Sequence, residues 1–185
     1  MTHLRRLIRT PGTYFVTSNT WERRRVFHKE EPAGLFLDCL FGYRKDQKFL
    51  LHEFVLMPDH FHLLLTPAAS ITLERAMQLI KGGSSHRIRQ ELGYKFPIWQ
   101  TGFDDHRIRS PRDYEQHQAY IHQNPVREKL VENAADYLFS SLHSQVQPLL
   151  DAWVPRTASA AKAAYGHVIR AGLKPGPDTT YNHDA

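Results

Sequence analysis

The sequence has little cysteine: Cys39 is the single one among 185 residues. One thiol excludes an internal disulfide framework and a zinc site made of four thiolates, and it fits a reducing cytoplasm. A metal ion bound by this chain would therefore need histidine, carboxylate or amide ligands.

Long apolar runs are also missing. No segment approaches the roughly 20 apolar residues that a membrane-spanning helix needs, and the basic N-terminus lacks the apolar core of a signal peptide. We therefore expect a cytoplasmic protein with no membrane partner. Hydrophobic residues still make up 41% of the chain and aromatic residues 11%, which is enough for a packed core and argues against a wholly disordered chain.

Acidic residues are fewer than basic ones. The chain has 24 Lys+Arg against 19 Asp+Glu, a formal charge of +5, and 16 of the basic residues are Arg. Because the planar guanidinium group suits phosphate contacts and base stacking, a polyanion such as a nucleic acid is a reasonable partner. The candidate DNA-binding residues in the densest basic runs are Arg5, Arg6, Arg9, Arg23, Arg24 and Arg25. A solvated surface is the alternative role for them.

Hydrophobic periodicity and turn residues predict seven elements. The predicted strands cover residues 13–17, 49–57, 60–66 and 98–100, and the predicted helices cover 32–43, 72–92 and 110–123. We expect Gly82 and Gly83 to kink or restart the second helix, and Pro125 to end the third. The order β-α-β-β-α-β-α predicts an α+β protein with a ferredoxin-like or RRM-like antiparallel sheet and its helices packed on one face.

The composition changes after His143. We expect one domain over residues 1–143 and a C-terminal extension over 144–185, which is rich in alanine and interrupted by prolines. A helix is predicted over 158–170, and the end of the chain from residue 174 is expected to be disordered.

His60-Phe61-His62 lies on the third predicted strand. The two-residue period of a strand places both imidazoles on one face and Phe61, Leu63 and Leu65 on the other. Two neutral imidazoles side by side can bind one divalent ion. With 12 histidines in the chain, however, the pattern alone is not diagnostic, and two solvent-facing strand histidines are the alternative interpretation.

A second group lies on the predicted helix that begins at Ser110. His117, Tyr120 and Asn124 follow the spacing i, i+3, i+7 and face one way. A tyrosine hydroxyl can act as a nucleophile, and an amide oxygen is a hard metal ligand. A core aromatic is the alternative role for Tyr120, and Tyr114 is the competing nucleophile.

Three separated motifs together resemble the single-tyrosine HUH transposases, and among these most closely the REP-associated tyrosine transposases. The motifs are Met57-Pro58-Asp59-His60-Phe61-His62-Leu63-Leu64-Leu65, Trp99-Gln100-x-Gly102-Phe103-x-Asp105-His106-x-Ile108-Arg109 and Tyr120-Ile121-His122-x-Asn124-Pro125-Val126. Lys81-Gly82, after the long predicted helix, also fits the family pattern and adds Lys81 to the candidate DNA-binding residues. The resemblance covers about residues 10 to 143 and does not extend into the tail.

This resemblance implies a role for each matching residue. His60 and His62 would be metal ligands for Mg²⁺ or Mn²⁺, Asn124 would supply a third ligand, and Tyr120 would be the nucleophile. The implied function is that of a metal-dependent endonuclease and strand transferase, acting on single-stranded DNA hairpins through a 5′-phosphotyrosine intermediate. Both a monomer and a homodimer are compatible with the resemblance.

Two other functions stay open from the residues themselves. A non-catalytic RRM-like nucleic-acid-binding module would share the fold and the basic charge, but it gives no reason for the two histidines and Tyr120 to converge. A metal-dependent nuclease that uses water would cleave DNA without a covalent adduct.

Overall fold

The protein is represented by a computed structural model that describes residues 12–155. Arg5, Arg6 and Arg9 lie outside the described residues. The helix predicted over 158–170 and the disorder predicted from residue 174 lie outside them as well.

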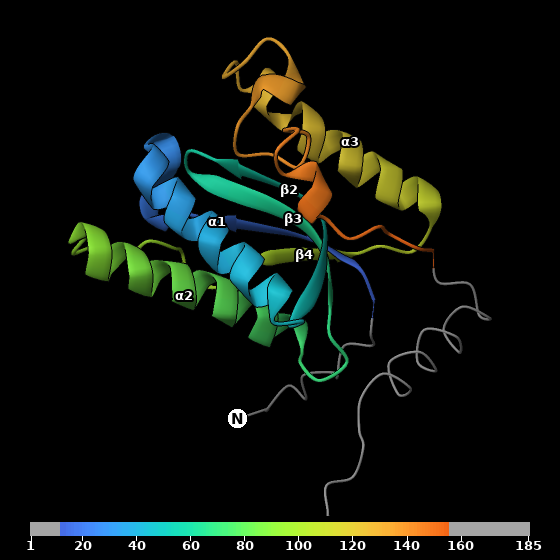
Figure 1. The fold of residues 1–185 in the computed structure, drawn as a ribbon, viewed down its shortest axis with the longest axis horizontal. Coiled ribbons are helices and arrows are strands. Elements are labelled where there is room, and N and C mark those ends of the chain that lie inside the picture. Colours follow the sequence, from blue (N-terminus) through green and yellow to red (C-terminus); the bar gives the residue numbers. More distant parts are fainter. Residues whose placement is uncertain (1–11, 156–185) are drawn as a thin grey trace, which may run out of the picture. The chain divides into compact units, whose positions relative to one another are not determined.

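A four-stranded antiparallel sheet is the centre of the described structure, in the order β2-β3-β1-β4 (Figure 1). The strands are β1 (Tyr14–Asn19), β2 (Phe49–Met57), β3 (His60–Pro67) and β4 (Asp104–Arg107). β2 and β3 form a tight hairpin in which Met57 pairs with His60. The two residues between the strands predicted over 49–57 and 60–66, Pro58 and Asp59, therefore form the turn of this hairpin.

Three α-helices and four short 3₁₀ helices complete the described part. The α-helices are α1 (Glu30–Lys45), α2 (Leu73–Leu92) and α3 (Pro111–Arg127), and the 3₁₀ helices are Trp21–Arg23, Val26–His28, Ala134–Asp136 and Gln147–Leu149. The predicted α+β class, the antiparallel sheet and the order β-α-β-β-α-β-α are confirmed. No helix among the described residues is both long and apolar enough to cross a membrane.

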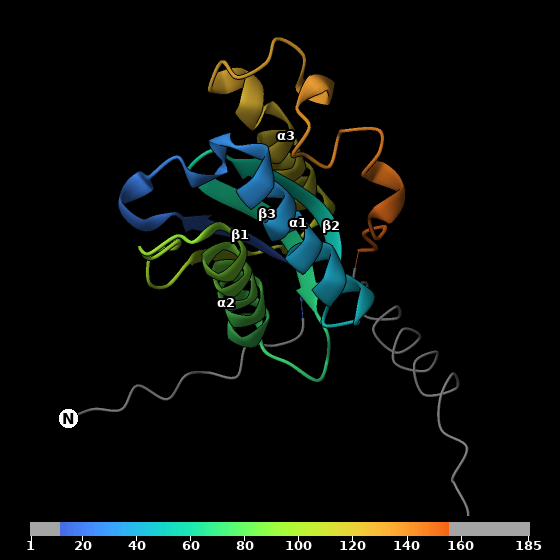
Figure 2. The same cartoon turned by 60° about the vertical axis from the view of Figure 1, so that its left-hand side comes forward.

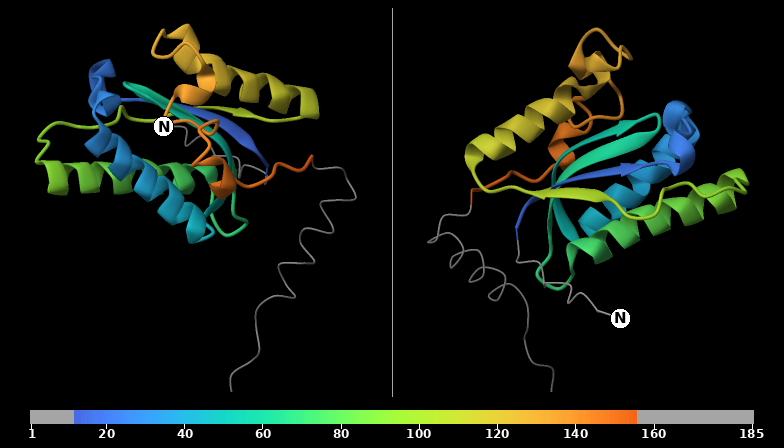
Figure 3. Two further views of the ribbon diagram at one scale, coloured as in Figure 1. Left: turned by 45° about the horizontal axis from the view of Figure 1, so that its top comes forward. Right: turned by 180° about the vertical axis from the view of Figure 1, so that it is seen from behind.

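The helices do not all pack on one face, which corrects part of the prediction. α1 and α2 lie side by side on one face of the sheet, whereas α3 crosses the opposite face (Figures 2 and 3). The reason is that the sheet is apolar on both sides: Val55, Met57 and Leu64 face α3, and Tyr114 and Ile121 of α3 cover them. The nearly continuous apolar run of β2 is the sequence signal for a strand buried on both faces.

The fourth strand lies six residues after the predicted one. Trp99 makes only an isolated bridge with Thr20, and its indole N–H donates to the buried hydroxyl of Ser84 on α2 at 3.1 Å. Ile98 and Trp99 therefore serve as core residues under α2. β4 itself, with the sequence Asp104-Asp105-His106-Arg107, is an edge strand. A polar edge strand carries little of the apolar alternation that a sequence analysis detects.

Both helix interruptions predicted from the sequence are absent. α2 runs without a break through Gly82 and Gly83 because its apolar side packs on the sheet. A Cβ atom on Gly83 would lie 2.6 Å from the Tyr43 hydroxyl, so glycine allows α1 to approach closely. α3 continues through Pro125 to Arg127, with Pro125 buried in its last turn.

The chain beyond His143 continues to pack on the sheet as far as Trp153, past the boundary predicted at residue 143. The Arg44 guanidinium donates to both oxygens of Asp151, at 2.8 and 2.7 Å, and the backbone N–H of Leu51 donates to the same carboxylate at 2.8 Å. Trp153 stacks on Tyr114 with ring centroids 4.2 Å apart. These contacts make residues up to Trp153 part of the compact unit.

Candidate active site

His60 and His62 lie on the face of β3 that α3 covers. Their ring centroids are 4.9 Å apart, while Phe61, Leu63 and Leu65 enter the core on the opposite face. The division of side chains predicted from the two-residue period is confirmed. The arrangement places two imidazoles where they can contact one ion.

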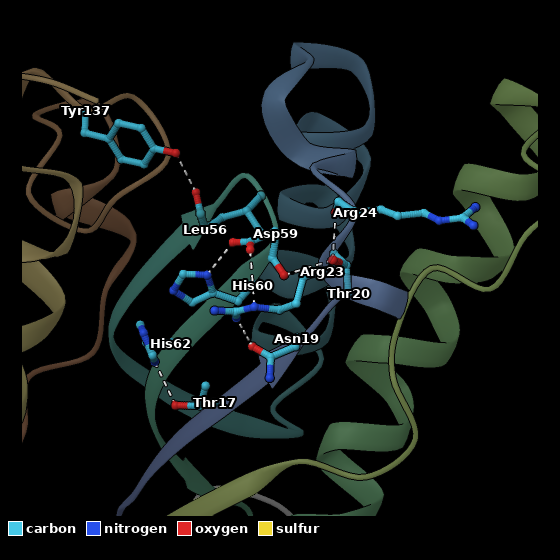
Figure 4. A network of polar contacts seen from close by, with 10 residues as sticks. All are labelled: Thr17, Asn19, Thr20, Arg23, Arg24, Leu56, Asp59, His60, His62 and Tyr137. Carbon is cyan, nitrogen blue, oxygen red and sulfur yellow. Dashed lines mark hydrogen bonds and ion pairs between the residues drawn. The ribbon is translucent and has the colours of Figure 1, made fainter. Parts of the chain in front are cut away.

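Each of these imidazoles has a partner at Nδ1 (Figure 4). His60 Nδ1 lies 2.7 Å from the Asp59 carboxylate, and His62 Nδ1 lies 2.7 Å from the Thr17 hydroxyl across the β1–β3 pair. A hydrogen bond at one ring nitrogen orients the ring and leaves the other nitrogen as the ligand atom. His62 Nε2 is buried without a hydrogen-bond partner among the described residues, which fits a metal ligand.

The environment keeps His62 neutral. Burial and, to a smaller extent, the nearby charges of His60 and Arg23 together lower the pKa of His62 to about 3. An imidazole must be neutral to bind a metal ion. The His62 imidazole is therefore neutral, and able to bind a metal ion, at physiological pH.

Arg23 supports this site from the loop after β1. Its guanidinium donates to the Asn19 side chain and lies 3.4 Å from Asp59 (Figure 4). Asp59 thus connects Arg23 to His60. The backbone of Arg23 has a positive φ of 54°, a conformation that costs energy in a non-glycine residue and often marks functional loops.

Tyr120 of α3 contacts His62, one histidine of the pair. Its ring lies edge-on to His62, with centroids 5.1 Å apart, and also contacts Phe15 of β1 at 5.9 Å. The side chain is 39% exposed, so the hydroxyl can be reached from solvent. The Arg127 guanidinium lies over the Tyr120 ring, 5.4 Å from its centroid. Asn124, one turn further along α3, is buried.

Tyr114 has a different environment from Tyr120. It is buried in the apolar cluster between α3 and the sheet and stacks on Trp153. Burial raises the pKa of its hydroxyl well above the ordinary value, with the charge of Glu53 adding to the effect. A hydroxyl in this position is hard to ionise and hard to reach, so Tyr114 is the weaker candidate nucleophile.

Two more of the described basic candidates are, like Arg23, engaged within the protein. Arg24 pairs with Glu22 at 2.7 Å and lies over the Phe96 ring. Lys81 donates to the carbonyl oxygens of Gln100, at 2.8 Å, and Gly102, and burial lowers its pKa to about 8. Lys81 therefore fixes the loop before β4. Arg24 is more exposed than Lys81, so it is the better placed of the two to contact a polyanion.

A second group of potential metal ligands lies at the start of α3. Ligand atoms of His106, Asp113 and His117 all lie within 4.8 Å of one another, which makes a possible His/Asp metal site. The ring nitrogens nearest one another are already engaged, however: His106 Nε2 lies 3.0 Å from the Asp113 carboxylate, and His117 Nδ1 lies 2.8 Å from the Asp113 backbone oxygen. The positive end of the helix dipole also disfavours a cation here. This cluster is less suited to a metal ion than the His60–His62 pair.

Several residues that surround the two histidines and Tyr120 are not evident from the sequence. Thr17 and Phe15 become visible only when β1 is placed beside β3, because no local pattern connects residues 45 or more positions apart. Asp59 was detectable, since a metal-binding histidine commonly donates its other ring N–H to a carboxylate. Arg127 lies two turns after Tyr120 on the same helix, a spacing that could have been noticed.

Comparison with known proteins agrees with this geometry. The family described as "Transposase IS200 like" matches residues 12–124. Over 147 residues the chain is 31% identical to a REP-associated tyrosine transposase of Escherichia coli, covering 79% of this chain and 86% of that protein. The solved structure of a REP-associated tyrosine transposase bound to a REP hairpin matches with a TM-score of 0.65 at 28% identity, covering 84% of this chain and 93% of that chain.

The fold and these matches define the class as tyrosine transposases, which are DNA-cleaving enzymes. The chain belongs to the IS200-like transposase family. Within that family it is similar to the REP-associated tyrosine transposases, as the three sequence motifs indicate.

Proposed function

We propose that this protein cuts and rejoins single-stranded DNA at hairpin-forming palindromes, with Tyr120 as the nucleophile. The observation that carries the proposal is the contact between Tyr120 and His62, whose buried Nε2 has no partner among the described residues. A reachable hydroxyl beside a free ligand nitrogen is the arrangement that metal-assisted phosphoryl transfer needs.

The proposed ligands for a divalent ion are His60, His62 and Asn124. The two imidazoles present Nε2 because Asp59 and Thr17 occupy their Nδ1 atoms. When bound, Mg²⁺ or Mn²⁺ supplies a Lewis acid that neutralises charge on the scissile phosphate. A set of two nitrogens and one oxygen suits Mn²⁺, and with water completing the shell it also accommodates Mg²⁺.

The covalent step is a transfer between two esters. The Tyr120 oxygen attacks phosphorus, its proton passes to solvent, and the bond between phosphorus and the 3′ oxygen breaks as that oxygen gains a proton. The products are a 5′-phosphotyrosine and a free 3′-OH. The Arg127 guanidinium, which lies over the Tyr120 ring, carries a positive charge that attracts the scissile phosphate. Since one phosphate ester replaces another, a 3′-OH can reverse the step without ATP.

The DNA hairpin is proposed as the substrate because the matching solved relative is bound to a REP hairpin. The positive charge of the chain supports a polyanionic partner. Tyr120, His60 and His62 come from one chain in this structure, which supports a monomer that is competent by itself. A homodimer remains the alternative for solution measurements of mass to decide.

The experiment is incubation of the full chain with labelled hairpin oligonucleotides and Mn²⁺, followed by a denaturing gel. We expect a protein–DNA adduct that forms with the wild type, disappears with Tyr120→Phe, and persists with Tyr94→Phe as a matched control on a distant loop. Cleavage without an adduct would contradict the proposal and favour water as the nucleophile. Hairpin binding without cleavage under any metal condition would favour a non-catalytic binding module.

A further inference from the structure

β2 contains one irregularity where it pairs with β3. Leu51 pairs with Leu65 and Glu53 pairs with Leu64, so His52 is an extra residue and forms a β-bulge. Bulges re-aim side chains and are common beside functional sites. This one changes which side of the strand the following residues occupy.

The effect of the bulge is visible in the packing on each face. Leu51 before it, and Phe54 and Leu56 after it, all enter the core beneath α1 and α2. His52 and Glu53 instead face α3, where His52 contacts the Tyr114 ring and Glu53 bonds to α3. The bulge therefore places a carboxylate between β2 and α3.

Glu53 is buried and has three side-chain partners. The Gln118 amide donates to Oε1, His122 Nε2 lies 2.8 Å from Oε2, and the Ser141 hydroxyl donates to Oε2. Burial pushes the pKa of Glu53 upward, but hydrogen bonds from these three partners push it down further, so the pKa is lowered overall. The group is ionised at neutral pH, and hydrogen bonds to a buried carboxylate are strong and directional.

Two of these partners flank Tyr120 along α3. Gln118 and His122 are four residues apart and share one flank of the helix, while Tyr120, midway between them, projects from the other side. Ile121 and Tyr114 lie on the apolar line between the two flanks. Hydrogen bonds from Gln118 and His122 to Glu53 therefore fix the rotation of α3 about its axis, and with it the direction of the Tyr120 side chain.

Small rotations matter at this distance from the helix axis. A side-chain group about 6 Å from the axis moves about 1 Å when a helix turns by about 10°. A misplacement of about 1 Å can reduce the rate of an enzyme step by about 100-fold. The apolar contacts of Tyr114 and Ile121 are not directional enough to prevent such a turn.

We propose that Glu53 is a positioning residue that holds α3 through Gln118 and His122 and thereby aims Tyr120 at the His60–His62 pair. This inference rests on the proposed role of Tyr120. Glu53 itself touches neither histidine of that pair, and its contribution is to the geometry of the attack.

The test compares Glu53→Gln with Glu115→Gln, the same change at an exposed position of α3. Four quantities are measured on the full chain well below its melting temperature: the single-turnover rate of adduct formation, the Kd for Mn²⁺, the Kd for the hairpin, and the ¹⁹F spectrum of 3-fluorotyrosine inserted at position 120. For Glu53→Gln we expect the rate to fall at least tenfold, both Kd values to stay within about twofold, and the ¹⁹F resonance to shift or broaden. Glu115→Gln should change none of them.

A second variant, His122→Ala, keeps the carboxylate with two partners and covers the case in which Glu53→Gln does not fold. It should give a smaller loss of rate in the same direction. An unchanged rate and ¹⁹F spectrum would overturn the proposal, as would a loss of rate that only follows a weaker Kd for metal or hairpin. If the wild type forms no adduct, the proposed function fails, whereas the ¹⁹F comparison still decides whether Glu53 orients Tyr120.

Discussion

At the scale of single residues, the two histidines of β3 have the same donor group but different surroundings. His60 is anchored by a carboxylate that also meets Arg23, and His62 is anchored by a hydroxyl from the neighbouring strand. His62 is the more buried of the two, and burial lowers its pKa to about 3. Since its Nε2 has no partner among the described residues, a bound ion would satisfy a group that is otherwise costly to bury.

His62→Ala should weaken Mn²⁺ binding at least about tenfold, because loss of a direct ligand should cost at least as much as loss of a residue that only hydrogen-bonds to a ligand. Titration of free Mn²⁺ by electron paramagnetic resonance measures this without relying on activity. His86→Ala, on the exposed side of α2, is the matched control and should bind Mn²⁺ as the wild type does. Equal affinity in both variants would show that the ion binds elsewhere, with the His106–Asp113–His117 cluster as the next site to examine.

At the scale of elements, α3 has three functional sides. One flank bonds to Glu53, the middle packs on the apolar second face of the sheet, and the other flank carries Tyr120. On the opposite face of the sheet, α1 and α2 pack closely because Gly83 leaves room for the Tyr43 ring. Neighbouring Gly82 has no atom within 4 Å of where a Cβ would lie.

These adjacent glycines give a matched pair of substitutions in one helix. Gly82→Ala should raise the free energy of unfolding by about 0.5–1 kcal/mol, since alanine suits a helix interior better than glycine. Gly83→Ala should be less stable than Gly82→Ala by about 1 kcal/mol or more, because the Tyr43 ring must move aside. Urea denaturation of both variants measures the difference, and equal stabilities would show that the α1–α2 contact is not tight at this point.

The sequence predicted the elements better than their contacts. His60 and His62 share a face because a strand has a fixed two-residue period, and Tyr120 shares a helix flank with Asn124 for the analogous reason. The contact between Tyr120 and His62 depends on which face of the sheet α3 covers, and that depends on tertiary packing. The β-bulge at His52 is equally hidden, because one extra residue in a strand leaves no clear mark on its apolar pattern.

At the scale of the whole molecule, the compact unit includes a C-terminal strap, residues 145–153, that the sequence placed outside the domain. Asp151 bonds to Arg44 of α1 and to the backbone of β2, and the Trp153 indole N–H donates to Thr13 at 3.0 Å. Burial raises the pKa of Asp151, but the hydrogen bonds from Arg44 and Leu51 lower it more, so the pKa is depressed overall. The strap thus connects both faces of the sheet.

Truncation after Ser144 should lower the free energy of unfolding by at least about 2 kcal/mol relative to truncation after Pro155, which keeps the strap. Because the pKa of Asp151 is depressed in the folded protein, its contribution is present above its ordinary value of 3.8 and is lost as the pH falls through the folded-state value. The difference between the two truncations should therefore shrink below about pH 4. Equal stability at pH 7 would show that the strap contributes nothing to the fold.

The central claim is that Tyr120 becomes joined to DNA, and the most direct measurement is to locate the adduct in the chain. Trypsin leaves Tyr114 and Tyr120 in one peptide, but a glutamate-specific protease cuts after Glu115 and separates them. Nuclease treatment, digestion and mass spectrometry of the adduct should place the residual nucleotide on the peptide over residues 116–128, which contains Tyr120. A nucleotide on the peptide that ends at Glu115 would exclude Tyr120 and contradict the account, and trypsin, which cuts after Lys95, would then distinguish Tyr114 from Tyr94.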